Sequence, residues 1–418
     1  MRIVSVFEAA AILVTATALF AFVNARYLKL PTPIGVTLAA LVLSLGLVVL
    51  GGPATATWAD ELLTVLDFDE LVLRGLLSFL LFAGALFVDL SDLLRHRGPI
   101  LALATIGLVL STLIVGGLSY VVGGWLGVEL PFAYALLFGA LISPTDPIAV
   151  LAILKRVGVG KDTEALITGE SLFNDGVAVV VFTVLLSLVA GDGHGAVGVG
   201  EIALLFVQEA LGGVAFGMLL GFAAYRLLGQ IDDYTTEILI TLAVVTGGYA
   251  AASWLHTSGP LAVVVAGLFI GNRGRLLAMS ARTRAHLDSF WELVDEVINA
   301  ILFVLIGIEV LVLKFTVLAV EAAIVAVPLV LLARLVSVSV PISLFRFRRD
   351  FAPYTTRLMV WGGLRGGISI ALALALPAGP ARDLILTMTY GVVVFSILVQ
   401  GLTVGRLARR SQAAAAGR

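Results

Sequence analysis

The chain contains no cysteine and little charge. Its 418 residues include no Cys, four His and only 13% charged residues. Without Cys there are no disulfides, no thiolate metal sites and no thiol chemistry. The histidines are too scattered to indicate a metal centre; they are His96, His194, His256 and His286. A formal net charge of −2 gives no sign of nucleic-acid binding.

Apolar sequence takes the place of charge. Hydrophobic residues make up 60% of the chain, whereas about 25% of a soluble domain is charged. Apolar runs of about 17–25 residues, the length that crosses a bilayer, recur from end to end. The first run, near 7–23, is followed rather than preceded by Arg26 and Lys29, so we interpret it as a retained helix and not a signal peptide. The sequence predicts an all-α polytopic protein embedded in the lipid bilayer.

We count about thirteen transmembrane helices. They are expected at roughly 7–24, 34–51, 71–90, 98–122, 133–154, 163–190, 198–228, 235–254, 259–272, 285–313, 316–344, 355–377 and 382–405. If helices 1–6 and 8–13 are repeats, a shift of seven helices inverts their topology, an arrangement common in secondary transporters. The fifth and twelfth spans occupy equivalent positions, and both carry helix-breaking segments, Ser143–Pro147 and Gly362–Gly367. These matched interruptions predict crossed, broken helices with a site near the membrane midplane.

The distribution of Lys and Arg predicts the orientation. With the N-terminus outside, 19 of the 26 basic residues fall on the inner side, four fall outside and three lie within spans. Inner loops are the basic ones in membrane proteins. We therefore expect a multi-pass protein of the cell (inner) membrane, with its C-terminus in the cytoplasm and the acidic segment Trp58–Glu70 outside.

The sixth span contains two carboxylates, which are rare at membrane depth unless they are functional. Glu170 and Asp175 are five residues apart, about 140° around a helix, so they should face different partners. Asp175 shares a face with Ser171, and we expect it to face the transported ion. Asn174 is expected to bind the broken fifth helix.

In the fifth span, Pro144 and Pro147 each remove a backbone donor and should unwind the helix. Asp146 then fits a helix N-cap. The freed carbonyls and the hydroxyl of Thr145 are hard oxygen ligands that suit a small cation. An ordinary proline kink is the alternative, but a kink alone does not call for a buried Asp.

Two arginines lie within spans and need partners, because a buried guanidinium stays charged. We expect Arg365 to lie opposite Asp146, where the broken helices cross, which leaves Arg334 for Glu170. Three carboxylates and two arginines leave one surplus negative charge, which one monovalent cation or one proton neutralises. The count predicts one-for-one, electroneutral exchange at Asp175. The other acids in or near spans are interpreted as interfacial: Glu209, Glu237, Glu292, Asp295, Glu296, Glu309 and Glu321.

These segments, together with Phe290–Glu292 and Phe303–Gly307, resemble those of the monovalent cation:proton antiporters, specifically the electroneutral Na⁺/H⁺ exchangers with an Asn-Asp pair. The resemblance is to the prokaryotic type. It implies that Asp175, Asn174, Ser171, Thr145 and Asp146 coordinate the ion, with Asp175, Thr145 and Ser171 as Na⁺ ligands. It also implies a structural Glu170–Arg334 pair. Ala83 departs from many relatives, which often carry an acidic residue there.

The resemblance further implies a homodimer in which a core moves as an elevator against a dimerisation domain. The expected divisions are a dimerisation domain at 1–97 and 231–314, a core ion-transport domain at 98–192 and 315–408, a linker helix at 193–230 and a short cytoplasmic tail at 409–418. No cofactor is expected besides the transported Na⁺, or Li⁺, and H⁺.

Three other functions compete with Na⁺/H⁺ exchange. A K⁺/H⁺ antiporter would use the same mechanism, since hydroxyl, amide and carboxylate oxygens suit both cations. A cation channel would line its pore with rings of charges or carbonyls from several subunits. An intramembrane enzyme could use Asp146 and Asp175 as an acid–base pair, but nothing indicates a substrate pocket, so we expect no enzyme. The choice between Na⁺ and K⁺, the pH set-point, the transport direction and the resting conformation stay open.

Overall fold

A computed structural model describes residues 5–50, 62, 65, 70–127, 130–190, 199–311, 313, 316–347, 351–352 and 354–416. Within these residues every element is a helix, apart from one isolated backbone bridge. Most of the expected outer segment Trp58–Glu70 lies outside the described residues. The predicted all-α class is therefore confirmed for the part of the chain that is described.

The helices follow the predicted spans closely. The first half contains α1 (Val6–Val23), α2 (Thr32–Leu50), α5 (Leu77–Leu86), α6 (Leu90–Arg95), α7 (Arg97–Ala102), α8 (Leu108–Leu126), α9 (Phe132–Ile142), α10 (Ile148–Val157), α11 (Lys161–Ala190) and α12 (Val199–Leu228). The second half contains α13 (Tyr234–Trp254), α14 (Gly259–Phe269), α15 (Arg275–Leu277), α16 (Ala281–Glu309), α17 (Val317–Arg346), α18 (Thr355–Trp361), α19 (Gly367–Leu374), α20 (Pro380–Phe395) and α21 (Gly401–Ala416). Five short π-helical segments adjoin them, at Asn24–Leu28, Leu71–Leu76, Leu103–Gly107, Ile270–Gly274 and Ser396–Gln400.

Seven helices in the described residues are long and apolar enough to cross a membrane, and four more are apolar but shorter. Helix α16 is in neither group, because Asp295 and Glu296 interrupt its apolar sequence. The fifth and twelfth expected spans are each divided into two short helices, α9 with α10 and α18 with α19. The C-terminal end differs from the prediction, since α21 continues as a helix through most of the expected tail, to Ala416.

Local sequence explains where several helices begin and end. The hydroxyl of Ser258 accepts a hydrogen bond from the Leu261 amide at the start of α14, and Ser280 caps α16 in the same way through the Thr283 amide. Gly158 adopts the left-handed conformation, φ 77°, that ends α10. The chain then turns directly into α11, so the fifth and sixth spans are neighbours in space.

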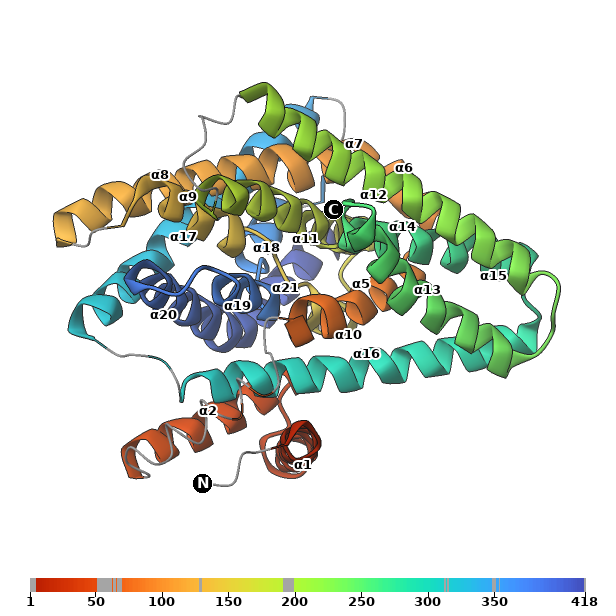
Figure 1. Cartoon of the computed structure of the whole chain (residues 1–418), viewed down its shortest axis with the longest axis horizontal. Helices are drawn as coiled ribbons and strands as arrows, with labels where there is room; N and C mark the ends of the chain where they lie inside the picture. Colours follow the sequence, from red (N-terminus) through yellow and green to blue (C-terminus); the bar gives the residue numbers. More distant parts are fainter. Residues whose placement is uncertain are drawn as a thin grey trace.

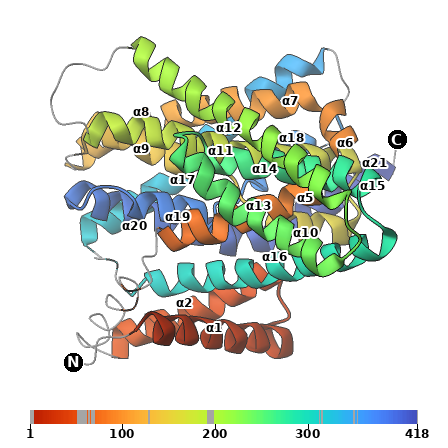
Figure 2. The same ribbon diagram turned by 45° about the vertical axis from the view of Figure 1, so that its right-hand side comes forward.

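The helices pack in two groups. In one group, α8 contacts α9 and α17, and α17 contacts α20; in the other, α14 contacts α5, α12 and α13. Helix α16 packs against α1 and α2, which lie on its outer side in Figures 1 and 2. Helix α11 contacts members of both groups. One buried apolar cluster joins Phe138 of α9 and Ile370 of α19 to Leu41 of α2 and Phe303 of α16, so the contact between these helices is largely apolar.

Candidate functional site

Two unwound segments cross at the centre of the molecule. Helix α9 ends at Ile142 and α10 begins at Ile148, while α18 ends at Trp361 and α19 begins at Gly367. At the crossing, the amide of Asp146 donates to the carbonyl of Leu364 at 2.8 Å, and the two residues form an antiparallel bridge. The broken helices predicted in the fifth and twelfth spans are therefore present, and they cross each other.

Glycine permits the close approach at this crossing. A Cβ atom on Gly366 would come 2.5 Å from Oδ2 of Asp146, and one on Gly363 would come 2.5 Å from Nε of Arg334. Real Cβ atoms essentially never come that close, so a larger residue at either position would displace the neighbouring side chain of Asp146 or Arg334. The glycine-rich sequence thus has a steric cause as well as a role in breaking the helix.

Arg365 binds the end of α9. Its side chain is buried, and Nη1 donates to the carbonyl oxygens of Ser143 and Pro144, the second at 2.7 Å. These carbonyls lie at the C-terminal end of α9, which carries partial negative charge and favours a cation. Arg365 thus lies at the crossing and neutralises a helix end, as predicted. The expected pairing with Asp146 is wrong, because the guanidinium binds backbone carbonyls instead.

Asp146 serves the neighbouring helix end. Its Oδ1 accepts a hydrogen bond from the Ile148 amide at 2.9 Å, where α10 begins. A carboxylate at this position matches the partial positive charge of a helix N-terminus. The two residues therefore bind opposite helix ends: Arg365 binds the negative end of α9, and Asp146 binds the positive end of α10. The hydrogen bond from Asp146 to the twelfth span comes from its main chain, which donates to Leu364.

Arg334 and Glu170 form the predicted ion pair. Both terminal nitrogens of Arg334 donate to the carboxylate of Glu170, with Nη2 to Oε2 at 2.9 Å. Nη2 also donates to the carbonyl of Met359 at 3.0 Å, in the last turn of α18. Glu170 and Arg334 are only 2% and 5% exposed. Each broken span thus has its first half capped at the C-terminal end by one buried arginine.

A polar network joins α11 to the unwound fifth span. Nδ2 of Asn174 donates to Oγ1 of Thr145 at 3.0 Å, and Oγ1 of Thr145 lies 3.0 Å from Oγ of Ser171. Oδ1 of Asn174 lies 3.5 Å from the Thr145 amide, at the limit of a hydrogen bond. The expected contact of Asn174 with the broken helix is therefore present, and Ser171 reaches the same threonine.

One carboxylate oxygen of Asp175 has no hydrogen-bond partner in the described residues. This oxygen is Oδ1, and the residue as a whole is 6% exposed. Buried polar atoms without partners are rare, because leaving one unpaired is costly. Asp175 faces a cavity, whereas Glu170 faces Arg334, so the two carboxylates have separate surroundings as the helical phase predicts. The free oxygen of Asp175 can take a proton or a cation.

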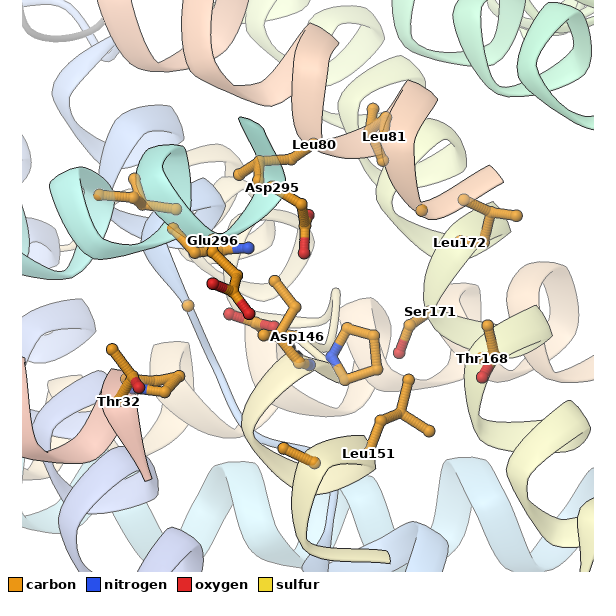
Figure 3. A pocket seen from close by; sticks show the side chains of 18 of the residues that line it. Thr32, Leu80, Leu81, Asp146, Leu151, Thr168, Ser171, Leu172, Asp295 and Glu296 are labelled. Carbon is orange, nitrogen blue, oxygen red and sulfur yellow. Dashed lines mark hydrogen bonds between the residues drawn. The ribbon is translucent and has the colours of Figure 1, made fainter. Parts of the chain in front are cut away.

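The cavity beside Asp175 has a volume of about 1230 Å³. Thr145, Asp146 and Ser171 also line it, so it reaches four of the five predicted ion-site residues; Asn174 lies behind them, bound to Thr145. Figure 3 shows Asp146, Ser171 and Thr168 in this cavity. The lining continues to three exposed basic residues: Lys155, Arg156 and Lys161. The site is therefore connected to one surface of the protein.

The structure also places two residues at the cavity that sequence analysis assigned to the membrane interface. Asp295 and Glu296 project from α16 toward Asp146 (Figure 3), and both line the cavity. The interfacial interpretation of these two residues is wrong, because α16 passes directly beside the crossing. The sequence contained a signal for this position, because Asp295 and Asn299 are four residues apart and therefore form a polar pair on one helix face.

The structure also shows how deeply several other residues named from the sequence are buried. Glu237 and Glu309 are 0% and 1% exposed, so protein surrounds them, whereas Glu292 and Glu321 are exposed. Ala83 is completely buried and does not line the cavity. No group of three or more acidic, histidine or cysteine side chains in the described residues could hold a metal ion together.

Comparison with known proteins identifies the same family that the sequence motifs resemble. The family described as "Sodium/hydrogen exchanger, transmembrane" matches residues 12–410. The Na⁺/H⁺ antiporter NhaP of Pseudomonas aeruginosa is 52% identical over 402 residues, which cover 94% of each chain. The Na⁺/H⁺ antiporter NhaH of Halobacillus aidingensis is 34% identical over 384 residues, which cover 91% of each chain.

The fold has a solved counterpart. The sodium proton antiporter MjNhaP1 from Methanocaldococcus jannaschii matches with a TM-score of 0.72 and 21% identity, covering 96% of this chain and 98% of the other. This likeness confirms the predicted fold class, a polytopic all-α membrane protein. Since the family match spans nearly the whole chain, from the first helix to the last, the protein belongs to the sodium/hydrogen exchanger family.

Proposed function

We propose that the protein exchanges Na⁺, or Li⁺, for H⁺ across the membrane, one for one and without net charge movement. The observation that carries this proposal is the unpartnered Oδ1 of Asp175, a residue that lines the same cavity as Thr145 and Ser171. Hydroxyl and carboxylate oxygens are ligands that small hard cations prefer. The relatives named above are Na⁺/H⁺ antiporters, which supports the same pair of ions here.

The charges around the crossing support the stoichiometry. Glu170 and Arg334 neutralise each other, which leaves Asp146 and Asp175 beside Arg365. These three residues carry one surplus negative charge when both carboxylates are ionised. One proton or one monovalent cation neutralises that surplus, and binding one displaces the other. Asp295 and Glu296 also line the cavity, but they do not enter this count. Asp295 is only partly buried and Glu296 is exposed, so solvent can screen their charges.

The division of the cavity wall supports alternating access. Asp146 and Asp175 belong to the expected core (98–192 and 315–408), while α1, α2, α5 and α16 of the expected dimerisation domain (1–97 and 231–314) line the other side. We propose that the core moves past this second wall as an elevator, connected through the linker helix 193–230. The contact between the core and this second wall is largely apolar. Apolar packing contains few directional bonds, so it is suited to sliding.

The cavity also suggests which state the structure represents. It reaches Lys155, Arg156 and Lys161, in a loop that the positive-inside pattern assigns to the cytoplasm. We propose that the structure is open to the cytoplasm, with the N-terminus outside and the C-terminus inside. The homodimer that the resemblance implies is part of the same proposal, and cross-linking of the protein in native membranes tests it.

The decisive experiment uses purified protein in liposomes. An imposed Na⁺ gradient should drive H⁺ movement at a rate that does not change when the membrane potential is clamped at zero. A clamp that accelerates exchange would contradict electroneutrality, and sustained current without proton coupling would indicate a channel. Repeating the assay with Li⁺, Na⁺, K⁺ and Rb⁺ decides between the Na⁺ and K⁺ proposals.

A further inference from the structure

Helix α16 presents a second polar pair to the cavity, away from Asp175. Asp295 and Asn299 lie one turn apart on α16, and both line the cavity. Asp295 is partly buried, whereas Asn299 is only 4% exposed. The side-chain oxygen of Asn299 has no hydrogen-bond partner among the described residues, and its amide group lies next to the carboxylate of Asp295. A buried amide oxygen without a partner, in a residue that lines a cavity, indicates that something else binds there.

This pair lies on the opposite wall from α11. In Figure 3, Asp295 extends from α16 into the cavity above Asp146, while Ser171 and Thr168 lie on the other side. No three acidic side chains in the described residues could hold one ion jointly, as noted above. Asp295 projects from α16 and Asp175 from α11, so we place a cation that Asp295 binds apart from the Asp175 position.

The surroundings of the pair favour a cation. The basic residues that line the cavity, Lys155, Arg156 and Lys161, lie at the far end of α10 or beyond it. Lys155 is nine residues from Asp146, about 13 Å along a helix. Asp146, Asp175, Asp295 and Glu296 also line the cavity, and Lys155, Arg156 and Lys161 are its only basic lining residues among those described. A carboxylate and an amide oxygen supply the hard ligands that a partly hydrated Na⁺ or Li⁺ requires.

We propose that Asp295 and the side-chain oxygen of Asn299 form a second monovalent-cation position, which holds Na⁺ or Li⁺ on its way between the cavity and Asp175. The inference rests on the proposed function, because it assigns a step of the same cation path. Asp295 belongs to the wall that stays in place, and Asp175 belongs to the core that moves. The second position is thus available to the ion on the cavity side of the membrane only.

The transport test compares apparent KM for Na⁺ on the two faces, in inside-out and right-side-out vesicles. Asp295→Asn should raise the apparent KM by about 3- to 10-fold on the cavity face, the effect of one lost charge contact in a water-filled site. The maximal rate and the KM on the opposite face should stay within about twofold of wild type. Glu292→Gln is the matched control, since Glu292 is an exposed acid on the same helix that does not line the cavity.

A compensating variant separates ion binding from a structural role. In the Asp295→Asn background, Asn299→Asp returns a carboxylate to the same face one turn away, and it should recover at least half of the lost affinity. An unchanged KM in Asp295→Asn would overturn the proposal. Equal KM increases on both faces, or an equal effect of Glu292→Gln, would also overturn it, since either result indicates a general effect of charge or of folding.

An equilibrium measurement tests the second position without transport. Line broadening of ²³Na⁺ by purified protein reports weak binding. Asp175→Asn should retain a residual, Li⁺-displaceable component, and adding Asp295→Asn should remove it. If Asp175→Asn alone removes all broadening, the second position does not exist. Failure of the proposed function has a different signature, namely wild-type protein that binds Na⁺ but moves no H⁺.

Discussion

Arg334 holds Glu170 through both of its terminal nitrogens and binds the carbonyl of Met359 with the same guanidinium. The pair therefore fastens α11, which carries Asp175, to α17 and to the end of α18. Arg365 does the equivalent for α9. The two arginines bind both sides of the crossing, and we propose that Asp175 is the carboxylate whose charge changes during transport.

Removing the charge of Glu170 should destabilise the protein strongly. Glu170→Gln leaves Arg334 buried without its counter-charge, which costs about 3–5 kcal/mol of the free energy of unfolding. The check is the unfolding temperature of purified protein in detergent. Glu321→Gln is the control, because Glu321 is an exposed acid on α17. Equal unfolding temperatures for wild type and Glu170→Gln would argue against the pair.

A methyl group at the crossing should impair transport. Gly366→Ala places Cβ 2.5 Å from Oδ2 of Asp146, so the Asp146 side chain must move from its position at the start of α10. We expect the exchange rate in proteoliposomes to fall at least about tenfold, which corresponds to about 1.4 kcal/mol in the activation barrier. Gly247→Ala is the matched control, since nothing lies within 4 Å of a Cβ at that helical position. Comparable rates for the two variants would show that the close approach is not needed.

The hydroxyl of Thr145 should be needed for cation affinity. Thr145→Val removes the oxygen that accepts from Asn174 and that contacts Ser171, and it leaves the Asn174 amide unpaired. We expect an increase of about tenfold in the apparent KM for Na⁺, equivalent to the roughly 1–3 kcal/mol that an orphaned buried group costs. Thr145→Ser keeps the hydroxyl and should behave like wild type. A normal KM in Thr145→Val would remove this residue from the ion path.

Asn174→Asp should weaken the site rather than simply add a charge. The Nδ2 donor to Thr145 is lost, and a second carboxylate appears beside Asp175. We expect the unfolding temperature to fall, with a cost of about 1–3 kcal/mol for the broken hydrogen bond. Asn174→Gln keeps the donor and is the comparison for charge. Unchanged stability in Asn174→Asp would mean that the Asn–Thr145 contact is dispensable.

The crossing, and the separate surroundings of Glu170 and Asp175, were predictable because they depend on local chemistry. Prolines remove backbone donors wherever they occur, and helical phase separates Glu170 from Asp175 whatever surrounds them. Pairing Arg334 with Glu170 needed only a count of buried charges. These features are present in the structure at the predicted residues.

The partner of Arg365 and the position of Asp295 depend on tertiary packing. Every residue offers a carbonyl, so sequence does not show that Arg365 binds those of Ser143 and Pro144. Likewise, an acid in a span can face lipid headgroups, another helix or a cavity. Only the course of α16 beside the crossing places Asp295 at the cavity.

The central claim is that one proton and one cation compete for Asp175. The most direct measurement is Na⁺-driven H⁺ movement in proteoliposomes containing wild type or Asp175→Asn, with the membrane potential clamped at zero. We predict that wild type exchanges the ions and that Asp175→Asn, although folded with a normal unfolding temperature, shows no exchange above empty liposomes. Wild-type rates of exchange in Asp175→Asn would contradict the account.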